Sequence, residues 1–399
     1  MTHGFLRSAL VLGLLSCVGP FAIDMYLPAM PQVGESLGGS ISATQMTLTA
    51  YFLAFGVAQM FYGPLADMYG RKRPLVVGLV LFIIGSIGCS FAPDMTTFIA
   101  SRFVQGLGGA AVMVIPRAII RDLHTGVAAT RLMALVMLVI SISPMLAPLA
   151  GSGLIAVGDW RLIFMALVVA GIVSILMTLF VQPETLQRKD RVPVSLKTLW
   201  SGTKTLVGDP IFMGLTFVGG FGMASFFVFL ASASFVYTEH YGLTPVGFSL
   251  AFAVNAIGFF TASQFAATLG ERFGMVRVVT WAVSGFLAFT VLLAALVAGG
   301  IDQLAVVIVF LILANACLGL VIPTTMVMAL DDHGDTAGLA SSLGGMFQMF
   351  AGGLMTVLVG PFFDGTPLPM VAAIAICAVI SFALMRLTLA ARRRALATA

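Results

Sequence analysis

The sequence predicts an all-α membrane protein with twelve transmembrane helices in two pseudo-symmetric six-helix bundles. Hydrophobic residues make up 60% of the 399 residues and charged residues 9%, whereas soluble domains carry about 25% charged residues. The mean hydropathy is +1.08. Apolar stretches of bilayer-spanning length recur along the chain, and the second half repeats features of the first. These observations exclude a soluble domain and predict a duplicated, polytopic membrane protein.

Each predicted helix is an apolar stretch of about 20 residues bounded by polar residues. The first continues past Gly19-Pro20 to Pro31 without a small-residue cleavage site, which is typical of a permanent helix and not of a signal peptide. The expected spans are 8–31, 42–66, 74–92, 95–118, 132–157, 161–182, 211–237, 246–268, 276–298, 303–328, 337–361 and 368–390.

The basic residues predict the orientation of these spans. With both termini in the cytoplasm, the Lys and Arg residues between the spans fall on the cytoplasmic side, and only Arg161 falls outside. This satisfies the positive-inside rule and predicts a bacterial inner-membrane protein. The net charge of +4 therefore requires no nucleic-acid partner, and the tail Arg392-Arg393-Arg394 is expected to lie on the membrane lipid surface.

No metal or cofactor site is expected. The four cysteines lie within apolar spans and the histidines lie in loops, without the spacing of metal ligands. The chain has no phosphate-binding Gly-rich loop. Because the spans also carry no paired carboxylates or nucleophile and base set, we expect no enzyme.

Two sequence echoes indicate the internal repeat. Gly63-Pro64-Leu65-Ala66-Asp67-Met68-Tyr69-Gly70-Arg71-Lys72-Arg73 follows the second span and Glu271-Arg272-Phe273-Gly274-Met275-Val276-Arg277 follows the eighth, with the same acid, Gly and Arg spacing. Val114-Ile115-Pro116 matches Val321-Ile322-Pro323. The predicted organisation is an N-terminal bundle over 1–185, a cytoplasmic linker over 186–209 and a C-terminal bundle over 210–399, as in many secondary transporters.

Asp24 and Arg102 are ionisable residues deep inside apolar spans. A charge at the bilayer centre costs about 2.5 to 3.5 kcal/mol on the mildest scale, so such residues usually mark a transport path. Each lies about seven residues, roughly 10 Å, from the outer end of its span. We expect Asp24 to carry the coupling proton while Arg102 sets its proton affinity; the alternative is a static ion pair that fixes helix packing.

Several motifs resemble known signatures. The loop residues Gly63, Leu65, Asp67, Gly70, Arg71 and Lys72, together with Arg102-Phe103-Val104-Gln105-Gly106-Leu107-Gly108, resemble those of the major facilitator superfamily. Three further segments resemble those of its Bcr/CflA-type drug exporters. They are Asp24-Met25-Tyr26-Leu27-Pro28-Ala29-Met30-Pro31, Ser143-Pro144-Met145-Leu146-Ala147-Pro148 and Pro183-Glu184-Thr185. The antiporter signature usually has glycines where this chain has Ser143 and Ala150. The resemblance covers the whole chain and implies the major facilitator fold, with drug/proton antiport.

The resemblance also implies a conformational latch formed by the loop after the second span. Its expected residues are Gly63, Asp67, Gly70, Arg71 and Asp122, with Arg71 pairing to both aspartates. Asp67 is expected to cap the start of span eleven near 336–339, because a helix N-terminus attracts a carboxylate. The alternative is a charged turn that only enforces topology.

Polar and aromatic residues that share helix faces are the substrate-binding candidates, alongside Asp24 and Arg102. They are Tyr26, Tyr51, Phe55, Gln59, Gln105, Met113, Phe226, Tyr237, Asn255, Phe259 and Gln348. For any single aromatic residue, packing or lipid contact is an equally good interpretation. Aromatic walls around one ionisable pair suit amphipathic drugs better than sugars.

The favoured function is therefore proton-coupled efflux of drugs by a monomer. The alternative is export or import of a small metabolite, such as an amino acid or a sugar, by the same fold. An intramembrane enzyme and a receptor or scaffold are less consistent with the sequence, because the spans lack catalytic sets and the loops are short.

Overall fold

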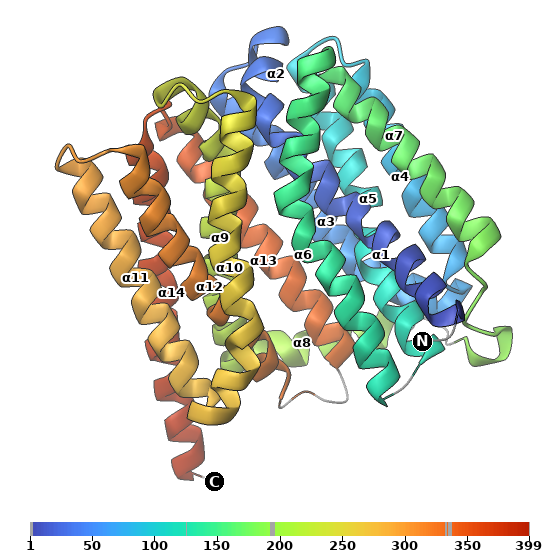
Figure 1. Ribbon diagram of the computed structural model, residues 1–399. Coiled ribbons are helices and arrows are strands. Elements are labelled where there is room, and N and C mark those ends of the chain that lie inside the picture. Colours follow the sequence, from blue (N-terminus) through green and yellow to red (C-terminus); the bar gives the residue numbers. More distant parts are fainter. Residues whose placement is uncertain (1–2, 125, 192–195, 332, 334–336, 399) are drawn as a thin grey trace. The chain divides into compact units, whose positions relative to one another are not determined.

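The computed structural model describes residues 3–124, 126–191, 196–331, 333 and 337–398. Within these ranges the regular structure is entirely helical (Figure 1). Twelve helical segments are long and apolar enough to cross a membrane, and their ends lie within about five residues of the predicted ones. The predicted fold class is confirmed.

The chain divides into two compact units, 1–195 and 196–399. The helices of the first are α1 (His3–Asp24), η1 (Leu27–Ala29), α2 (Met30–Ser36), α3 (Ile41–Tyr69), α4 (Lys72–Ser90), α5 (Met95–Leu123), α6 (Gly126–Val157), α7 (Arg161–Leu176), η2 (Met177–Val181) and η3 (Arg188–Asp190). Those of the second are α8 (Leu196–Gly208), α9 (Pro210–Phe235), η4 (Val236–His240), α10 (Pro245–Phe273), α11 (Met275–Ala298), α12 (Leu304–Leu330), α13 (Ala337–Val359), η6 (Gly360–Phe362) and α14 (Pro367–Thr398).

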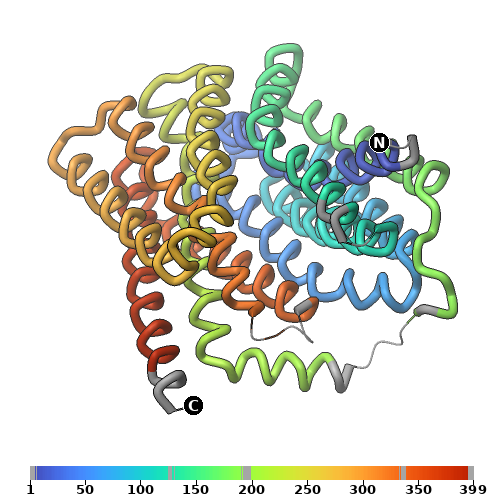
Figure 2. Tube along the Cα trace, turned by 60° about the horizontal axis from the view of Figure 1, so that its bottom comes forward, coloured from blue at the N-terminus to red at the C-terminus, as the bar shows by residue number. Residues whose placement is uncertain are grey.

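In the first unit, α3 and α4 both pack on α5, α1 packs on α6 and α4 packs on α7. In the second unit, α9 packs against α13 and α14, while α10 and α11 both pack on α12. The C-terminal end of α14 runs past the ends of its neighbours (Figures 1 and 2). Because the helices of each unit pack on one another and bury apolar side chains, each unit has its own apolar core.

The repeat predicted from the sequence is visible in two corresponding helices, α3 and α10, which begin and end in the same way. α3 and α10 both contain 29 residues and both begin after a hydroxyl cap: Ser40 accepts from the amide of Ala43 at 3.2 Å, and Thr244 from the amide of Gly247 at 3.1 Å. Both helices end at a glycine with positive φ, +89° at Gly70 and +84° at Gly274. Only glycine adopts this conformation without strain, which explains both stops.

Two segments differ from the predictions. α5 continues to Leu123 instead of ending near 118, because Ile119 and Ile120 are buried and extend its apolar face. This brings Asp122 onto the last turn of the helix. The predicted linker contains α8, in which Leu206 is buried while Trp200 is 74% exposed. Such a short amphipathic helix carries too many polar residues to register as an apolar stretch.

Candidate functional site

Arg102 lies at the centre of a buried polar cluster in the first unit. α5 holds it in place, beginning after Asp94, whose carboxylate accepts from the amide of Thr97 at 2.8 Å. The Arg102 side chain is completely buried. Its Nη1 donates to the carbonyl oxygen of Ala22 at 3.0 Å and to Oε1 of Gln105. Nε and Nη2 have no hydrogen-bond partner among the described residues, so two donors of a desolvated cation stay available.

The carbonyl that receives Arg102 belongs to the last turn of α1, which ends at Asp24. The last four carbonyls of a helix lack intrahelical partners, and the C-terminal end of the helix dipole attracts a cation. Pro28 reinforces the stop, since it has no amide to donate to the carbonyl of Asp24. Arg102 therefore caps the C-terminus of α1.

Aromatic rings complete the surroundings of the guanidinium group. Its central carbon lies 4.6 Å from the ring centre of Tyr51, 5.0 Å from that of Tyr26 and 5.9 Å from that of Phe164. Cation–π attraction at such distances is strongest when water is excluded. We call Arg102, Gln105, Tyr26, Tyr51 and Phe164 the aromatic cage.

Asp24 is buried next to the cage, with 6% of its surface exposed. It lies two residues from Ala22, so the predicted common depth of Asp24 and Arg102 agrees with the contact. However, the ion pairs found among the described residues do not join these two side chains. The structure therefore gives no support to a static ion pair, and the coupling role of Asp24 stays a prediction.

Gln105 connects the cage to α4. Its Nε2 donates to Oγ of Ser86 at 2.8 Å, and Ser86 donates to the carbonyl of Phe82 at 2.7 Å. Glycines of the same motif let α5 approach both α3 and α4 closely: a Cβ on Gly106 would lie 2.4 Å from the carbonyl oxygen of Tyr51 in α3, and one on Gly108 would lie 2.3 Å from the amide of Phe82 in α4. Small residues that let backbones touch are typical of membrane helix interfaces.

The remaining candidates of the first unit divide into two groups. The hydroxyl of Tyr26 lies 2.9 Å from that of Thr47, the hydroxyl of Tyr51 donates to the carbonyl of Gly19 at 3.3 Å, and Phe55 stacks on Tyr51 with ring centres 5.9 Å apart. Gln59 and Met113 are partly buried and lie farther along α3 and α5, roughly 12 Å from Tyr51 and 16 Å from Arg102 by helix rise.

The candidates of the second unit form an aromatic cluster without a charge. Asn255 and Tyr237 are fully buried, and Nδ2 of Asn255 donates to the Tyr237 hydroxyl at 3.2 Å. Oδ1 of Asn255 has no hydrogen-bond partner among the described residues. The partly buried rings of Phe226 and Phe259 stack with centres 6.3 Å apart. Gln348 on α13 faces α9, where a Cβ on Gly219 would lie 3.4 Å from its Nε2.

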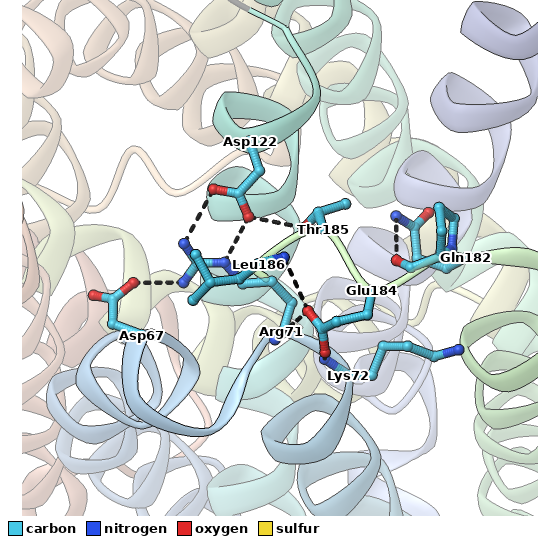
Figure 3. A network of polar contacts seen from close by, with 9 residues as sticks. Asp67, Arg71, Lys72, Asp122, Gln182, Glu184, Thr185 and Leu186 are labelled. Carbon is cyan, nitrogen blue, oxygen red and sulfur yellow. Dashed lines mark hydrogen bonds and ion pairs between the residues drawn. The ribbon is translucent and has the colours of Figure 1, made fainter. Parts of the chain in front are cut away.

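The predicted partners of Arg71 are present in a second polar network (Figure 3). Nε and Nη2 of Arg71 donate to the two carboxylate oxygens of Asp122 at 2.7 and 3.1 Å, and Nη1 donates to Asp67 at 2.5 Å. Burial alone lowers the pKa of Arg71, but its hydrogen bonds with Asp122 and Asp67 raise that pKa above its ordinary value. The Thr185 hydroxyl also donates to Asp122, at 2.8 Å.

Glu184 is a member of this network that the sequence interpretation missed. Its Oε1 accepts from the amides of Arg71 at 2.9 Å and Leu186 at 3.2 Å, and its Oε2 accepts from the amide of Lys72 at 3.2 Å. The carboxylate thus caps the start of α4, where unpaired amides favour an anion. The Pro183-Glu184-Thr185 tripeptide was the available signal, but its sequence separation from Arg71 hid the contact.

Gly70 and Gly63 differ in how closely they are packed and in their backbone conformation. A Cβ on Gly70 would lie 2.7 Å from Oε2 of Glu184, and its φ is +89°. A Cβ on Gly63 would meet no described atom within 4 Å, so packing within its unit gives no reason for glycine there. Asp67 was expected to contact the start of span eleven at residues 336–339. Residue 336 lies outside the described residues, so this contact stays a prediction.

Comparison with known proteins identifies the family. Residues 12–356 match the model of the Major Facilitator Superfamily. The chain is 33% identical to the uncharacterized MFS-type transporter YdgK of Bacillus subtilis, over 94% of this chain and 93% of that protein. It is 30% identical to the bicyclomycin resistance protein homolog of Haemophilus influenzae, over 93% of each. A chloramphenicol resistance protein of Pseudomonas aeruginosa is 29% identical over 73% of this chain and 69% of its own length.

Solved structures agree on the fold. The xylose transporter XylE of E. coli superimposes with a TM-score of 0.72 at 12% identity, over 96% of this chain and 97% of its own. The human organic anion transporter TETRAN gives a TM-score of 0.70 at 17% identity, over 96% and 100%. The chain belongs to the major facilitator superfamily, and it is an integral membrane protein.

Proposed function

We propose that this protein exports amphipathic drugs in exchange for protons. The relatives named for bicyclomycin and chloramphenicol resistance support drugs as the substrate class. The observation that carries the proposal is that Asp24 is buried two residues from the Ala22 carbonyl that Arg102 binds, while two donors of that guanidinium are unpaired among the described residues. A buried carboxylate is costly unless it is paired or protonated, and this site offers a route to each state.

The proposed cycle uses two positions of the Asp24 side chain. When protonated, Asp24 is neutral and stays apart from Arg102, as in the described arrangement. When it releases the proton, the carboxylate moves to the free Nε and Nη2 donors of Arg102, which compensate its charge. Because the same guanidinium contacts the aromatic rings, a bound drug and the proton would compete for one site.

Proton coupling supplies enough energy for this task. One proton moving down one pH unit releases about 1.4 kcal/mol, and a membrane potential of 100 mV adds about 2.3 kcal/mol per charge. A hundredfold gradient of a neutral solute requires about 2.7 kcal/mol. One proton per drug is therefore sufficient.

The network around Arg71 is proposed to stabilise one conformation of the cycle. Bidentate pairing with Asp122 makes the end of α5, the start of α4 and the chain after η2 a single rigid corner. Such a corner transmits helix movement without taking part in binding. The further proposals are a monomer in the bacterial inner membrane, with both termini cytoplasmic and no enzymatic activity.

Asp24→Asn tests the coupling role. The variant keeps the size and polarity of the side chain but cannot release a proton, so drug efflux driven by a pH gradient in everted vesicles should disappear. Glu35→Gln is the matched control, since Glu35 is an exposed carboxylate at the end of the same span and should transport normally. Gradient-driven efflux by Asp24→Asn at the wild-type rate would refute the coupling role.

A drug-susceptibility panel tests the substrate class. Cells that express the wild-type protein should tolerate several chemically different amphipathic drugs better than cells without it, and a protonophore should abolish the difference. If no drug is exported while a sugar or an amino acid is, the drug assignment is wrong.

A further inference from the structure

The first unit contains an apolar cavity of about 480 Å³ between α1, α6 and α7. This volume lies in the range of sites that hold drug-sized ligands. The cavity is distinct from the aromatic cage, whose Arg102 and Tyr51 do not line it. The lining consists of Leu14, Cys17, Val18, Phe21, Met25, Val139, Ile142, Ser143, Leu146, Ala166, Leu167 and Ala170.

One polar group in this apolar lining has no partner. Ser143 is 1% exposed, and its Oγ makes no hydrogen bond within the described residues. A helical serine usually donates to the carbonyl four residues earlier, but here the carbonyl of Val139 faces the thiol of Cys17 at 3.7 Å. A buried hydroxyl without a partner is destabilising. Because Ser143 is one of the residues that line the cavity, a ligand whose polar group reached this hydroxyl would supply the missing partner.

The depth of Ser143 in the membrane favours a small molecule over a phospholipid as the ligand of its hydroxyl. The membrane span of α6 covers Arg131–Val157, so Ser143 lies 12 residues from one end and 14 from the other, roughly 20 Å from each. Lipid head groups lie outside the hydrocarbon core of about 30 Å. An acyl chain would fill the cavity but leave the Ser143 hydroxyl unpaired.

Three of the side chains that line the cavity are apolar and exposed, which is compatible with entry from an apolar phase. Leu14, Ile142 and Leu146 are 55%, 41% and 53% exposed. Met25 also lines the cavity; it follows Asp24 directly in the chain and is itself buried. A ligand in the cavity would therefore contact the helix turn that carries the proposed coupling acid.

We infer that this cavity binds amphipathic small molecules that dissolve in the bilayer and carry one hydrogen-bonding group for Ser143. It is a second ligand site besides the aromatic cage. The inference rests on the proposed function only for the biological source of the ligand, since binding itself requires neither transport nor protons.

Photolabelling tests the site without transport. The probe is a diazirine derivative of octanol, an apolar chain with one hydroxyl, added to the purified full-length protein in nanodiscs, with adducts mapped by mass spectrometry. The wild-type protein should carry adducts on the cavity-lining segments of α1, α6 and α7. Ala166→Phe, which fills the cavity, should reduce them by about tenfold or more. Val169→Phe, on the 59% exposed face of α7, should leave them unchanged.

Substitution at the hydroxyl gives a second, milder test. Ser143→Ala keeps the cavity and removes one hydrogen bond, so probe affinity should fall about fivefold, while the matched control Ser141→Ala should bind like the wild type. Equal labelling in Ala166→Phe and the wild type would overturn the inference. So would a co-purified phospholipid that is lost only in Ala166→Phe, since the cavity would then hold lipid. Labelling as predicted together with no drug efflux would reject the proposed function alone.

Discussion

Gly108→Ala is the substitution for which the structure gives the clearest magnitude. A Cβ at this position would lie 2.3 Å from the amide nitrogen of Phe82, 2.8 Å from its Cα and 2.4 Å from the carbonyl oxygen of Gly78. All three atoms belong to the backbone of α4, so no side-chain rotation relieves the clash. Ordinary contact for a Cβ begins at 3.4 Å, and α4 and α5 must therefore separate by about 1 Å locally.

The cost follows from that separation. Overpacking of a tight interface typically costs about 1–3 kcal/mol. The 2.8 Å hydrogen bond from Gln105 to Ser86 crosses the same interface, and its loss adds about 1 kcal/mol. Alanine returns about 1 kcal/mol through its higher helix propensity. We expect Gly108→Ala to lower the free energy of unfolding by about 2 kcal/mol.

The assay is thermal unfolding of purified protein, followed by intrinsic fluorescence under one set of detergent conditions. Gly153→Ala in α6 is the matched control, because a Cβ there would meet no described atom within 4 Å. The control should unfold at or slightly above the wild-type temperature, and Gly108→Ala several degrees below it. If Gly108→Ala melts no lower than Gly153→Ala, the close packing of α4 on α5 is not what requires glycine.

Two further substitutions test the polar networks. Glu184→Gln replaces one acceptor oxygen by an NH2 group, so amides at the start of α4 that bond to Glu184, those of Arg71 and Lys72, should exchange hydrogen about fivefold faster; unchanged exchange there would contradict the capping role. Arg102→Lys keeps the charge but lacks a planar guanidinium, so the variant should fold while drug transport falls by about tenfold or more. Arg161→Lys, at a partly exposed arginine, is the control and should transport normally. Normal transport by Arg102→Lys would show that the aromatic cage contributes to helix packing and not to transport.

The sequence was sufficient for the fold because hydropathy is averaged over about 20 residues, and such an average locates a membrane span reliably. The helix ends also carried local signals, such as Ser40 before α3 and Gly70 after it. α8 was missed since its short apolar face is broken by lysines and threonines. Averaging cannot detect a helix whose two faces cancel.

The site was less predictable because side-chain direction and distant contacts are not local properties. Equal depth predicted that Asp24 and Arg102 could meet, yet Arg102 Nη1 donates to the carbonyl of Ala22 in the last turn of α1. That preference depends on where the helix stops, which the apolar pattern obscured. Glu184 was quoted only as part of a motif, since nothing in the sequence places it beside a loop more than a hundred residues earlier.

The duplication preserves geometry but not chemistry. Aligned on Gly70 and Gly274, both loops share a positive φ and an acid before the glycine. However, the position of Arg71 is taken by Met275 in the second copy, so the second loop cannot form the same charged corner. The buried cation likewise belongs to the first unit, whereas the second unit offers neutral Asn255 and Tyr237. Because charge is costly at membrane depth, the proposed coupling site needs its charges in one unit alone, and the corresponding positions of the other unit can stay neutral.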